Sequence, residues 1–504
     1  MKNNKLIVLI TLSLTLTACS LVGGEKQEFL SEKPMIVEVN DGETFNLTAQ
    51  PIKKTVDGRE LNLLSYNGII PGPVIKVKQG SKITVNLINK LETPTTLHAH
   101  GIRMKNEFDG VPDVTQKPIN PGETFTYQLD FLDAGVFWYH PHIREDRDQE
   151  LGLYGVILVT PAKADNWPIA DQEEIIVLDD MLVSAQGQAV FYPDVVTHAI
   201  MGRFGNTLMI NNQISYNLET EVGKKLRLYL VNVANARPFE FVIDGTQLNL
   251  IGSDAGLYQN PQKVSSVVLG PSERAIVEIN FDEPGSYLIK NQTPKKSYVL
   301  GRINVTDASD EGTNLLESIS KNQSNDQVWE NITSLLEKPV DKSLRLNMVM
   351  GVMGGMGGHA NHQGGMMMGG NGEKIEWEDD MAEVNAFSTN LNTTWQLIDE
   401  DTGQINHDIK WQFKQGEIVK IRIFNDPNSM HPMQHPIHLH GQRFAILTVD
   451  GRPNDNLVWK DTVLVQTGQT IELAVEMQNP GSWALHCHIP EHMESGMMTV
   501  FSVI

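Results

Sequence analysis

Cysteine is scarce in this chain, and an excess of basic residues is absent. Two cysteines in 504 residues exclude a disulfide-built scaffold. Lysine and arginine number 40 against 62 aspartate and glutamate residues, which gives a net charge of −22. Nucleic acid is therefore not expected as a partner, because no basic stripe could neutralise phosphates. The length and a hydrophobic fraction of 40% predict roughly two to four packed domains.

An apolar run at Leu6–Leu16 follows Lys2 and Lys5. It is shorter than the roughly 20 residues that a membrane-spanning helix needs, so it predicts a signal peptide over residues 1–19. The run ends in Leu-Thr-Ala-Cys19, which resembles the lipobox of bacterial lipoproteins. We expect acylation of Cys19, which would leave the protein outside the cytoplasm, anchored in the cell envelope by lipid.

Two sequence units recur three times. The first is a glycine, an alternating stretch and an asparagine nine residues on, as in GSKITVNLIN (80–89), GKKLRLYLVN (223–232) and GEIVKIRIFN (416–425). The second unit begins at Pro121, Pro271 and Thr467 and has a glycine fourteen residues later. The chain is therefore predicted to be a tandem triplicate.

Both units alternate apolar and polar residues and end in Pro, Gly or Asn turns, which is typical of β-sandwich strands. Long helical periodicity is absent from the sequence. We expect an all-β protein with domains at 34–162, 170–306 and 340–504. Residues 307–339 are polar and helix-tolerant and are expected to form a linker.

Eight of the 15 histidines form four His-x-His pairs. These are His98 and His100, His140 and His142, His438 and His440, and His486 and His488. On a strand, residues i and i+2 point to one face about 7 Å apart, so each pair can offer two imidazoles to one cavity. The pairs fall at matching points of domains 1 and 3, whereas domain 2 has Lys290-Asn291-Gln292 there. We expect several metal ions between domains 1 and 3, with domain 2 as a spacer without ligands.

Cys487 lies between two of these histidines, so on a strand its sulfur points to the opposite face. His435, His492 and Met497 are close to it in sequence. Two histidines, a thiolate and a weak axial methionine form the ligand set of a blue-copper electron-transfer site.

The motifs LHAHG (97–101), WYHPH (138–142), HPIHLHG (435–441) and HCHIPEHMESGMM (486–498) resemble the copper motifs of three-domain multicopper oxidases, including bacterial copper-efflux and copper-resistance oxidases. The resemblance extends over essentially the whole mature chain. It implies cupredoxin-like Greek-key sandwich or barrel domains, and four copper ions: one type 1, one type 2 and two type 3. Their reaction takes single electrons from a donor and reduces dioxygen to water with four.

The resemblance also implies a role for each ligand. Type 1 copper is assigned to His435, Cys487 and His492, with Met497 axial. Type 2 copper is assigned to His98 and His438. The type 3 pair is assigned to His100, His140, His142, His440, His486 and His488.

Dioxygen reduction consumes protons, which a buried carboxylate can relay. Asp109, in the segment FDGVP, matches the family's acidic residue near the trinuclear centre. The family often has glutamate directly after the last type 1 histidine, but here that residue is Met493. Glu491 and Glu494 flank this region and are the alternative candidates for the second proton donor.

A methionine- and glycine-rich insertion is expected over 348–370, and seven of the 20 methionines lie in it. Soft thioethers select Cu(I), and the composition resembles methionine-rich segments of copper-resistance oxidases. The alternative is a disordered low-complexity tract. The candidate substrate-copper ligands are Met348, Met350, Met353, Met356, His359, His362, Met366, Met367, Met368, His431 and Met433.

We therefore expect a monomeric, lipid-anchored oxidase that converts Cu(I) to Cu(II) in copper tolerance, with dioxygen as acceptor. A laccase-like oxidase of phenols or aromatic amines, or a ferroxidase, is the alternative within the family. A non-catalytic copper-binding lipoprotein and a copper nitrite reductase are the alternatives from other classes.

Overall fold

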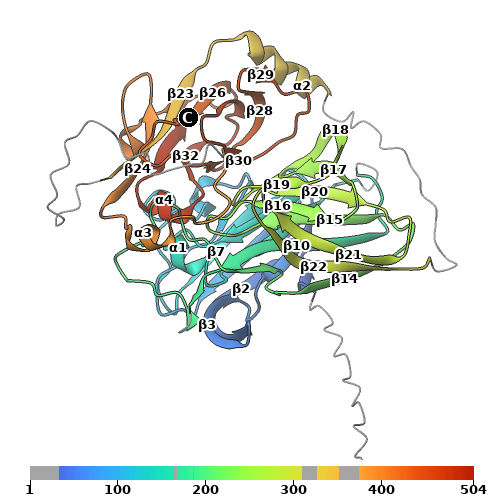
Figure 1. The fold of residues 1–504 in the computed structure, drawn as a ribbon. Helices are drawn as coiled ribbons and strands as arrows, with labels where there is room; N and C mark the ends of the chain where they lie inside the picture. The colour runs from blue at the N-terminus through green and yellow to red at the C-terminus, as the bar shows by residue number, and fades with distance from the viewer. Residues whose placement is uncertain (1–32, 164–166, 185–186, 309–325, 351–373) are drawn as a thin grey trace, which may run out of the picture. The chain divides into compact units, whose positions relative to one another are not determined.

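The computed structural model describes residues 33–163, 167–184, 187–308, 326–350 and 374–504. Three pairs of β-sheets follow one another along these residues, which confirms the expected all-β fold with three tandem domains (Figure 1). The expected signal peptide and lipidation site lie outside the described residues. Among the helices that are described, none has the length and apolar character needed to cross a membrane.

Domain 1 packs the sheet β1-β4-β9-β8-β6 against the sheet β3-β2-β5-β7. Apolar side chains of both sheets, among them Leu47, Val85, Phe137 and Ile157, form one core. The elements are β1 (Ile36–Glu38), β2 (Thr44–Val56), β3 (Arg59–Tyr66), β4 (Gly72–Lys78), β5 (Lys82–Asn89), β6 (His98–Ala99), η1 (Asn106–Phe108), β7 (Thr124–Asp130), β8 (Gly135–His140), α1 (Glu145–Asp148) and β9 (Gly155–Thr160).

Domain 2 packs the sheet β13-β10-β15-β20-β17-β18 against the sheet β14-β22-β21-β16-β19, and β11-β12 is a small separate hairpin. Leu228, Phe241, Val277 and Ile303 are among its core residues. The strands are β10 (Gln172–Met181), β11 (Val183–Ser184), β12 (Gly187–Gln188), β13 (Thr207–Ile210), β14 (Tyr216–Glu221), β15 (Leu226–Asn232), β16 (Phe239–Ile243), β17 (Leu248–Ser253), β18 (Gly256–Val264), β19 (Val267–Leu269), β20 (Arg274–Ile279), β21 (Gly285–Gln292) and β22 (Ser297–Thr306).

Domain 3 packs the sheet β24-β23-β26-β31-β28-β29 against the sheet β25-β33-β32-β27-β30. Ile423, Leu473, Leu485 and Phe501 are among its core residues. The elements are β23 (Lys342–Met350), α3 (Ala382–Phe387), β24 (Thr393–Asp399), η4 (Asn406–Asp408), β25 (Gln412–Phe413), β26 (Ile418–Asn425), β27 (His435–Leu439), β28 (Arg443–Val449), β29 (Arg452–Pro453), β30 (Thr462–Val465), β31 (Thr470–Glu476), β32 (Gly481–Cys487), α4 (Pro490–Glu494) and β33 (Met498–Val503).

The repeated asparagine has the same structural role in each domain. It ends β5, β15 and β26, each of which pairs with one parallel and one antiparallel neighbour. The Asn89 amide donates to the carbonyls of Thr93 and Ile119 at 2.9 and 2.8 Å. Asn232 and Asn425 each bridge two carbonyls in the same way. The side chain therefore fixes the loop that follows each strand, which explains its recurrence.

Part of the expected linker is helical and packs on a neighbouring domain. Residues 326–337 form α2 (Asp326–Thr333) and η3 (Ser334–Glu337), which pack against domain 3 beside β28 (Figure 1). Trp329, Ile332 and Leu335 are buried there, and the Trp329 ring lies 4.9 Å from that of Trp459. Their spacing of three residues places them on one helix face, so this part of the linker is an amphipathic helix.

The expected insertion begins later than its composition suggested. Met348, predicted as a loop residue, lies in β23, which runs to Met350. Its side chain is fully buried in the core of domain 3, so it belongs to the strand and not to the insertion, and its role as a substrate-copper ligand stays a prediction. Residues 351–373 lie outside the described residues. That range holds the other candidate ligands of the insertion: Met353, Met356, His359, His362, Met366, Met367 and Met368.

Candidate metal centre

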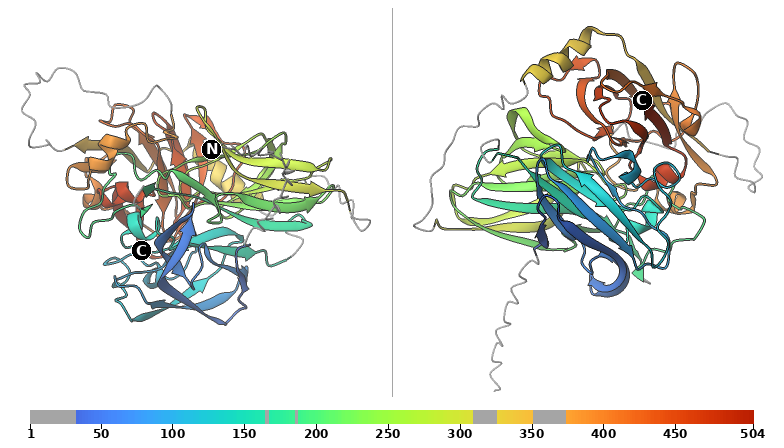
Figure 2. Two further views of the ribbon diagram at one scale, coloured as in Figure 1. Left: turned by 60° about the horizontal axis from the view of Figure 1, so that its bottom comes forward. Right: turned by 180° about the vertical axis from the view of Figure 1, so that it is seen from behind.

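Four strand ends bring the eight paired histidines together. His98 on β6 pairs with His140 at the end of β8, and His438 on β27 pairs with His486 on β32. The two halves meet where Nε2 of His98 lies 3.3 Å from Nε2 of His438. The cluster therefore lies between domains 1 and 3. The short helices α1 and α4, which follow two of the histidine pairs in the chain, are in contact with each other (Figures 1 and 2).

The buried histidines fall into three groups whose ligand atoms lie within 4.8 Å of one another. The groups are His98, His100 and His438; His100, His140 and His488; and His142, His440 and His486. His100 belongs to two of them. The cluster thus offers three adjoining sets of three nitrogens.

Most of the Nδ1 atoms in the cluster are held by oxygen acceptors. Nδ1 donates to the carbonyl oxygens of Asp109, Pro141, Asp461 and Cys487 from His98, His140, His438 and His486, respectively. These hydrogen bonds are 2.7 to 2.9 Å long, and because a carbonyl can only accept, they place the proton of each ring on Nδ1.

The Nε2 atoms consequently face one another with their lone pairs. Nε2 of His100 lies 2.9 Å from both His140 and His488, and His440 lies 2.9 Å from His486. Burial, reinforced by neighbouring imidazoles, lowers the pKa of these five histidines well below its ordinary value. The rings are therefore neutral, and no proton lies between the facing nitrogens. Facing lone pairs on neutral imidazoles need a cation between them, and imidazole is a suitable ligand for copper.

Two carboxylates orient the cluster from outside. Asp109 accepts from Nδ1 of His440 at 2.9 Å, and its Oδ1 lies 3.3 Å from Nδ1 of His98. Asp461 Oδ1 lies 3.4 Å from Nδ1 of both His100 and His438. Such partners fix ring orientation and strengthen ligand basicity.

Asp461 is itself held by domain 2. Arg274 forms a bidentate pair with it, in which Nη1 lies 2.8 Å from Oδ1. Burial acts to raise the pKa of Asp461, but the Arg274 guanidinium and the contact with His438 outweigh it, so the pKa lies below its usual range. This pair could not be predicted from the sequence, because no local spacing links Arg274 to Asp461.

Glu145 was also missed. Its Oε1 lies 3.1 Å from Nδ1 of His142 and its side chain is fully buried, so burial raises its pKa well above the usual value. In the sequence, the position of Glu145 three residues after His142 was the one feature that could have indicated this contact.

A second site lies on the opposite face of β32. Sγ of Cys487 lies 3.5 Å from Nδ1 of His435 and 3.7 Å from Nδ1 of His492, and all three residues are buried. The Met497 side chain is buried in the same core, and its carbonyl accepts from the Cys487 amide at 3.1 Å. The alternation along β32 thus separates Cys487 from His486 and His488 while keeping them covalently adjacent.

The donor set at Cys487 also fits a metal. Burial raises the thiol pKa far above its usual value, so the thiolate needs a neighbouring cation. Burial lowers the pKa of His435 to about 3, which leaves the imidazole neutral and available. Nε2 of His492 donates to the carbonyl of Ile200 in domain 2 at 3.2 Å, so Nδ1 is the nitrogen that faces the sulfur.

The two glutamates predicted as proton donors lie on α4. Glu491 is fully buried, 3.8 Å from Nε of Arg203 and 3.3 Å from the Asn235 amide nitrogen. Glu494 is partly buried, and its charge interacts with Arg144 and Asp146 at α1. Burial raises the pKa of both glutamates to about 7.

Two of the described substrate-copper candidates precede the Cys487 site in the chain. His431 and Met433 are buried just before β27, which begins at His435, and the Met433 carbonyl accepts from Asn425 at 2.7 Å. Nε2 of His431 lies 2.8 Å from Sδ of Met201, a domain 2 residue that the sequence analysis did not single out. Domain 2 is therefore more than a spacer.

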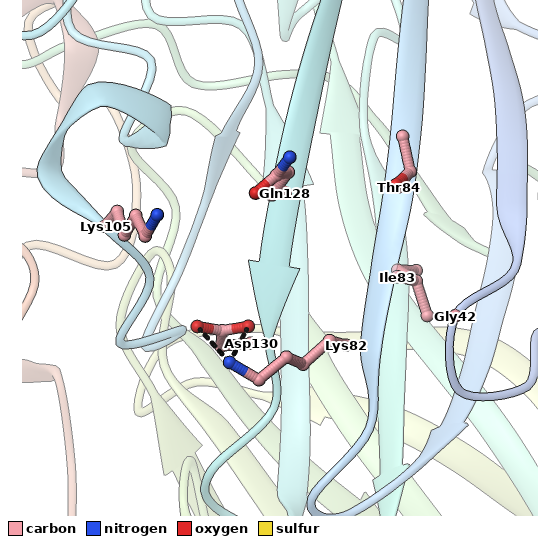
Figure 3. Close-up of a pocket in the computed structure, with 7 residues that line it drawn as sticks. All are labelled: Gly42, Lys82, Ile83, Thr84, Lys105, Gln128 and Asp130. Atoms are coloured by element: carbon pink, nitrogen blue, oxygen red, sulfur yellow. Dashed lines mark hydrogen bonds and ion pairs between the residues drawn. The ribbon is translucent and has the colours of Figure 1, made fainter.

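A surface pocket on domain 1 lies across β5 and β7 (Figure 3). It contains the Lys82–Asp130 ion pair, with Nζ 3.3 Å from Oδ1, and Lys105 and Gln128 also line it. Its lining residues include no histidine or cysteine, and it shares no residue with the metal groups.

The fold and the donor sets define a three-domain copper protein whose first and third domains share a histidine cluster. Family models described as multicopper oxidase match residues 48–164, 165–315 and 378–504. The chain therefore belongs to the multicopper oxidase family, and it is a copper-dependent, laccase-like oxidoreductase that uses dioxygen as acceptor.

Individual relatives agree with this assignment. The chain is 28% identical to "Multicopper oxidase mco" of Staphylococcus epidermidis, over 87% of this chain and 83% of that protein. It is 27% identical to "Laccase-1" of Botryotinia fuckeliana, over 90% and 81% of the two chains. The crystal structure of a multi-copper oxidase from Pseudomonas thermotolerans matches with a TM-score of 0.69 at 26% identity, over 93% and 100% of the chains. The cupredoxin-like fold of the three domains is thereby confirmed.

Proposed function

We propose that this protein oxidises Cu(I) to Cu(II) in copper tolerance and passes the electrons to dioxygen. The observation that carries the proposal lies at the end of β23, after which the methionine-rich segment follows in the sequence. There the Met350 amide donates to Sδ of Met430 at 3.4 Å, and Met430 is 49% exposed. Met430 precedes His435 by five residues, so an exposed thioether lies in the loop that leads to the Cys487 site. Thioethers prefer Cu(I) over harder cations.

The proposal assigns four copper ions to the donor sets. His435, Cys487 and His492 would hold type 1 copper, with Met497 axial. His98 and His438 would hold type 2 copper, and the other six cluster histidines would hold the type 3 pair. When bound, these ions supply one-electron acceptance at the type 1 site and four-electron reduction of dioxygen at the cluster.

The protein's own part in electron transfer is the peptide around Cys487. The Cys487 side chain faces the donor side, whereas His486 and His488 face the cluster. Because His486 and His488 are the direct neighbours of Cys487, the covalent path for electrons between the two sites is short. The electron donor and dioxygen therefore need not bind at the same site.

Proton supply is assigned to carboxylates. Asp109 is the best supported, because it contacts both His98 and His440. Glu494 is partly buried on α4, which contacts α1, the helix whose Glu145 reaches His142. Glu491 faces Arg203 and Asn235 and stays the alternative donor.

A laccase-like oxidation of phenols or aromatic amines is the second candidate, favoured by the similarity to the protein named "Laccase-1". Oxygen uptake by the copper-loaded protein separates the two, with chelated Cu(I) and then a simple phenol as donor. We expect uptake with Cu(I) that falls when residues 353–368 are deleted. Uptake with phenol alone, unaffected by that deletion, would establish the laccase instead.

We also propose that the protein is a monomer anchored at Cys19 in the cell envelope. One chain contains all the histidines of the cluster, so a partner chain is not needed. Cys19→Ser should move the protein from the membrane fraction to the soluble fraction and abolish incorporation of labelled palmitate. Unchanged fractionation would contradict the anchor.

A further inference from the structure

A segment of domain 2, residues 199–202, lies against the Cys487 site. The carbonyl of Ile200 accepts from Nε2 of His492 at 3.2 Å, and the carbonyl of Ala199 accepts from the Trp395 indole at 2.7 Å. The middle domain therefore reaches the donor side of the proposed type 1 copper.

Side chains at α3 and just after it fix this segment in place. Oδ1 of Asn385 accepts from the Met201 amide, and Oγ of Ser388 accepts from the Ile200 amide, both at 3.0 Å. The Asn385 amide also donates to the carbonyl of Gly202 at 2.9 Å. Met201 is thus placed by hydrogen bonds on both sides of it, as a rigid ligand position requires.

Met201 and His431 converge from two domains. Sδ of Met201 lies 2.8 Å from Nε2 of His431, and the two side chains are 1% and 3% exposed. A thioether is a weak hydrogen-bond acceptor, but it is a soft ligand that selects Cu(I), and imidazole is a suitable second ligand for copper. We propose that Met201 and His431 bind the substrate Cu(I) on the donor side of the type 1 copper; this inference rests on the proposed function.

Trp395 connects this pair to the Cys487 site. Its ring lies 6.5 Å from the His431 ring, 4.8 Å from the His435 ring and 4.1 Å from the His492 ring, on which it stacks. Cu(I) held at Met201 and His431 would give up one electron and leave as Cu(II), and the copper that His435, Cys487 and His492 would hold supplies the acceptor when bound. Four such electrons, with four protons, would reduce one dioxygen to two water molecules.

The donor atoms also give the site its selectivity. The soft thioether favours Cu(I) and Ag(I), whereas non-haem Fe(II) sites typically combine histidine with a carboxylate. The site therefore discriminates against a ferroxidase reaction. Cu(II), a harder ion than Cu(I), is held less tightly by the thioether, which favours release of the product.

The test uses Ag(I), which resembles Cu(I) but is not oxidised, so that binding is measured apart from turnover. Ag(I) is soaked into crystals of the copper-loaded protein and titrated calorimetrically into its solution. The variants are Met201→Leu and His431→Gln, with Met209→Leu, another buried methionine of domain 2, as the matched control. We expect an anomalous peak between Met201 and His431 that both variants lose and the control keeps.

In solution, Met201→Leu should weaken this Ag(I) site and raise KM for Cu(I), each by about 10-fold, while the visible band of type 1 copper is retained. Absence of the anomalous peak, or an unchanged Ag(I) affinity in Met201→Leu, would overturn the site and show that the pair only packs. If the wild-type protein oxidises phenol but not Cu(I), the proposed function fails, while the Ag(I) peak still decides the binding site.

Discussion

Arg274 of the middle domain and Asp461 of the third domain form a fully buried, bidentate ion pair beside the histidine cluster. The pair also contacts two of the cluster histidines, because Oδ1 of Asp461 lies 3.4 Å from Nδ1 of both His100 and His438. Domain 2 supplies none of the cluster ligands among the residues that the structure describes, but it holds the carboxylate that orients two of them.

Asp461→Asn should therefore weaken copper binding by the group of His98, His100 and His438. We expect a loss of affinity of about 10- to 100-fold, because outer partners of metal-bound histidines have effects of that size. Copper content after dialysis against a graded chelator measures it. Asp133→Asn is the matched control, since Asp133 of domain 1 joins Arg103 of its own domain to Arg443 of domain 3 and has no hydrogen bond or ion pair to a histidine among the described residues. Equal copper loss in both variants would contradict a specific role of Asp461.

Cys487→Ser should abolish the visible absorption band and the oxidation of donors. Burial raises the pKa of the thiol, so the thiolate of Cys487 exists only with a bound cation, and serine cannot supply that ligand. The histidine cluster lies on the other face of β32 and should keep its copper. Absorption spectra and metal analysis of the purified variant check both statements. A variant that still oxidised Cu(I) at the wild-type rate would exclude the proposed electron path.

Asn425→Ala should lower the free energy of unfolding by about 2 to 3 kcal/mol, because two buried carbonyls lose their donor. The Asn425 amide bridges the carbonyls of Met433 and Val465 at 2.7 and 3.1 Å, so the segment before His435 should loosen as well. Denaturant unfolding and the visible band of type 1 copper measure the two effects. Asn89→Ala breaks the equivalent contacts in domain 1 and should destabilise similarly without altering the band. A band that changed equally in both variants would argue against this local explanation.

Asp179 should make stability depend on pH. Burial raises its pKa to about 8, against the hydrogen bond from the Tyr154 hydroxyl at 2.5 Å. Between about pH 4 and 8, that is, between the ordinary pKa of an aspartate and the raised pKa of Asp179, the folded protein keeps a proton that the unfolded chain releases. The free energy of unfolding therefore falls as pH rises through this range and levels off above about pH 8. The slope from this group is about 1 kcal/mol per pH unit.

Asp179→Asn mimics the protonated acid, so its free energy of unfolding should fall less steeply between pH 5 and 8 than that of the wild type. Denaturant titrations at several pH values give the two slopes, and Asp194→Asn, a change at an exposed position, is the control. Parallel slopes in the wild type and Asp179→Asn would show that Asp179 is ionised in the fold.

Much of the architecture follows from strand periodicity alone. Alternation along HCH predicted that the sulfur of Cys487 and the two imidazoles face opposite sides, and the described geometry has that arrangement. The matching positions of the histidine pairs predicted a cluster between domains 1 and 3. Both inferences need only local spacing and a repeat.

The contributions of domain 2 could not be predicted in this way. Arg274, Ile200 and Met201 reach the sites only because the three sandwiches pack in one arrangement, and no spacing within a strand encodes that packing. Met348 was misplaced for a different reason: the methionine-rich composition of the insertion obscured the alternation of the strand that precedes it. The buried face of α2, in contrast, was visible in the three-residue spacing of Trp329 and Ile332.

The contact between His98 and His438 joins residues 340 positions apart in the chain. During synthesis, the first domain can fold while the last is still being made, and at that stage each group has fewer than its three nitrogens. A nascent or C-terminally truncated chain therefore cannot assemble a centre that reacts with oxygen. The histidine cluster is complete only in molecules in which the first and the third domain are both folded and in contact.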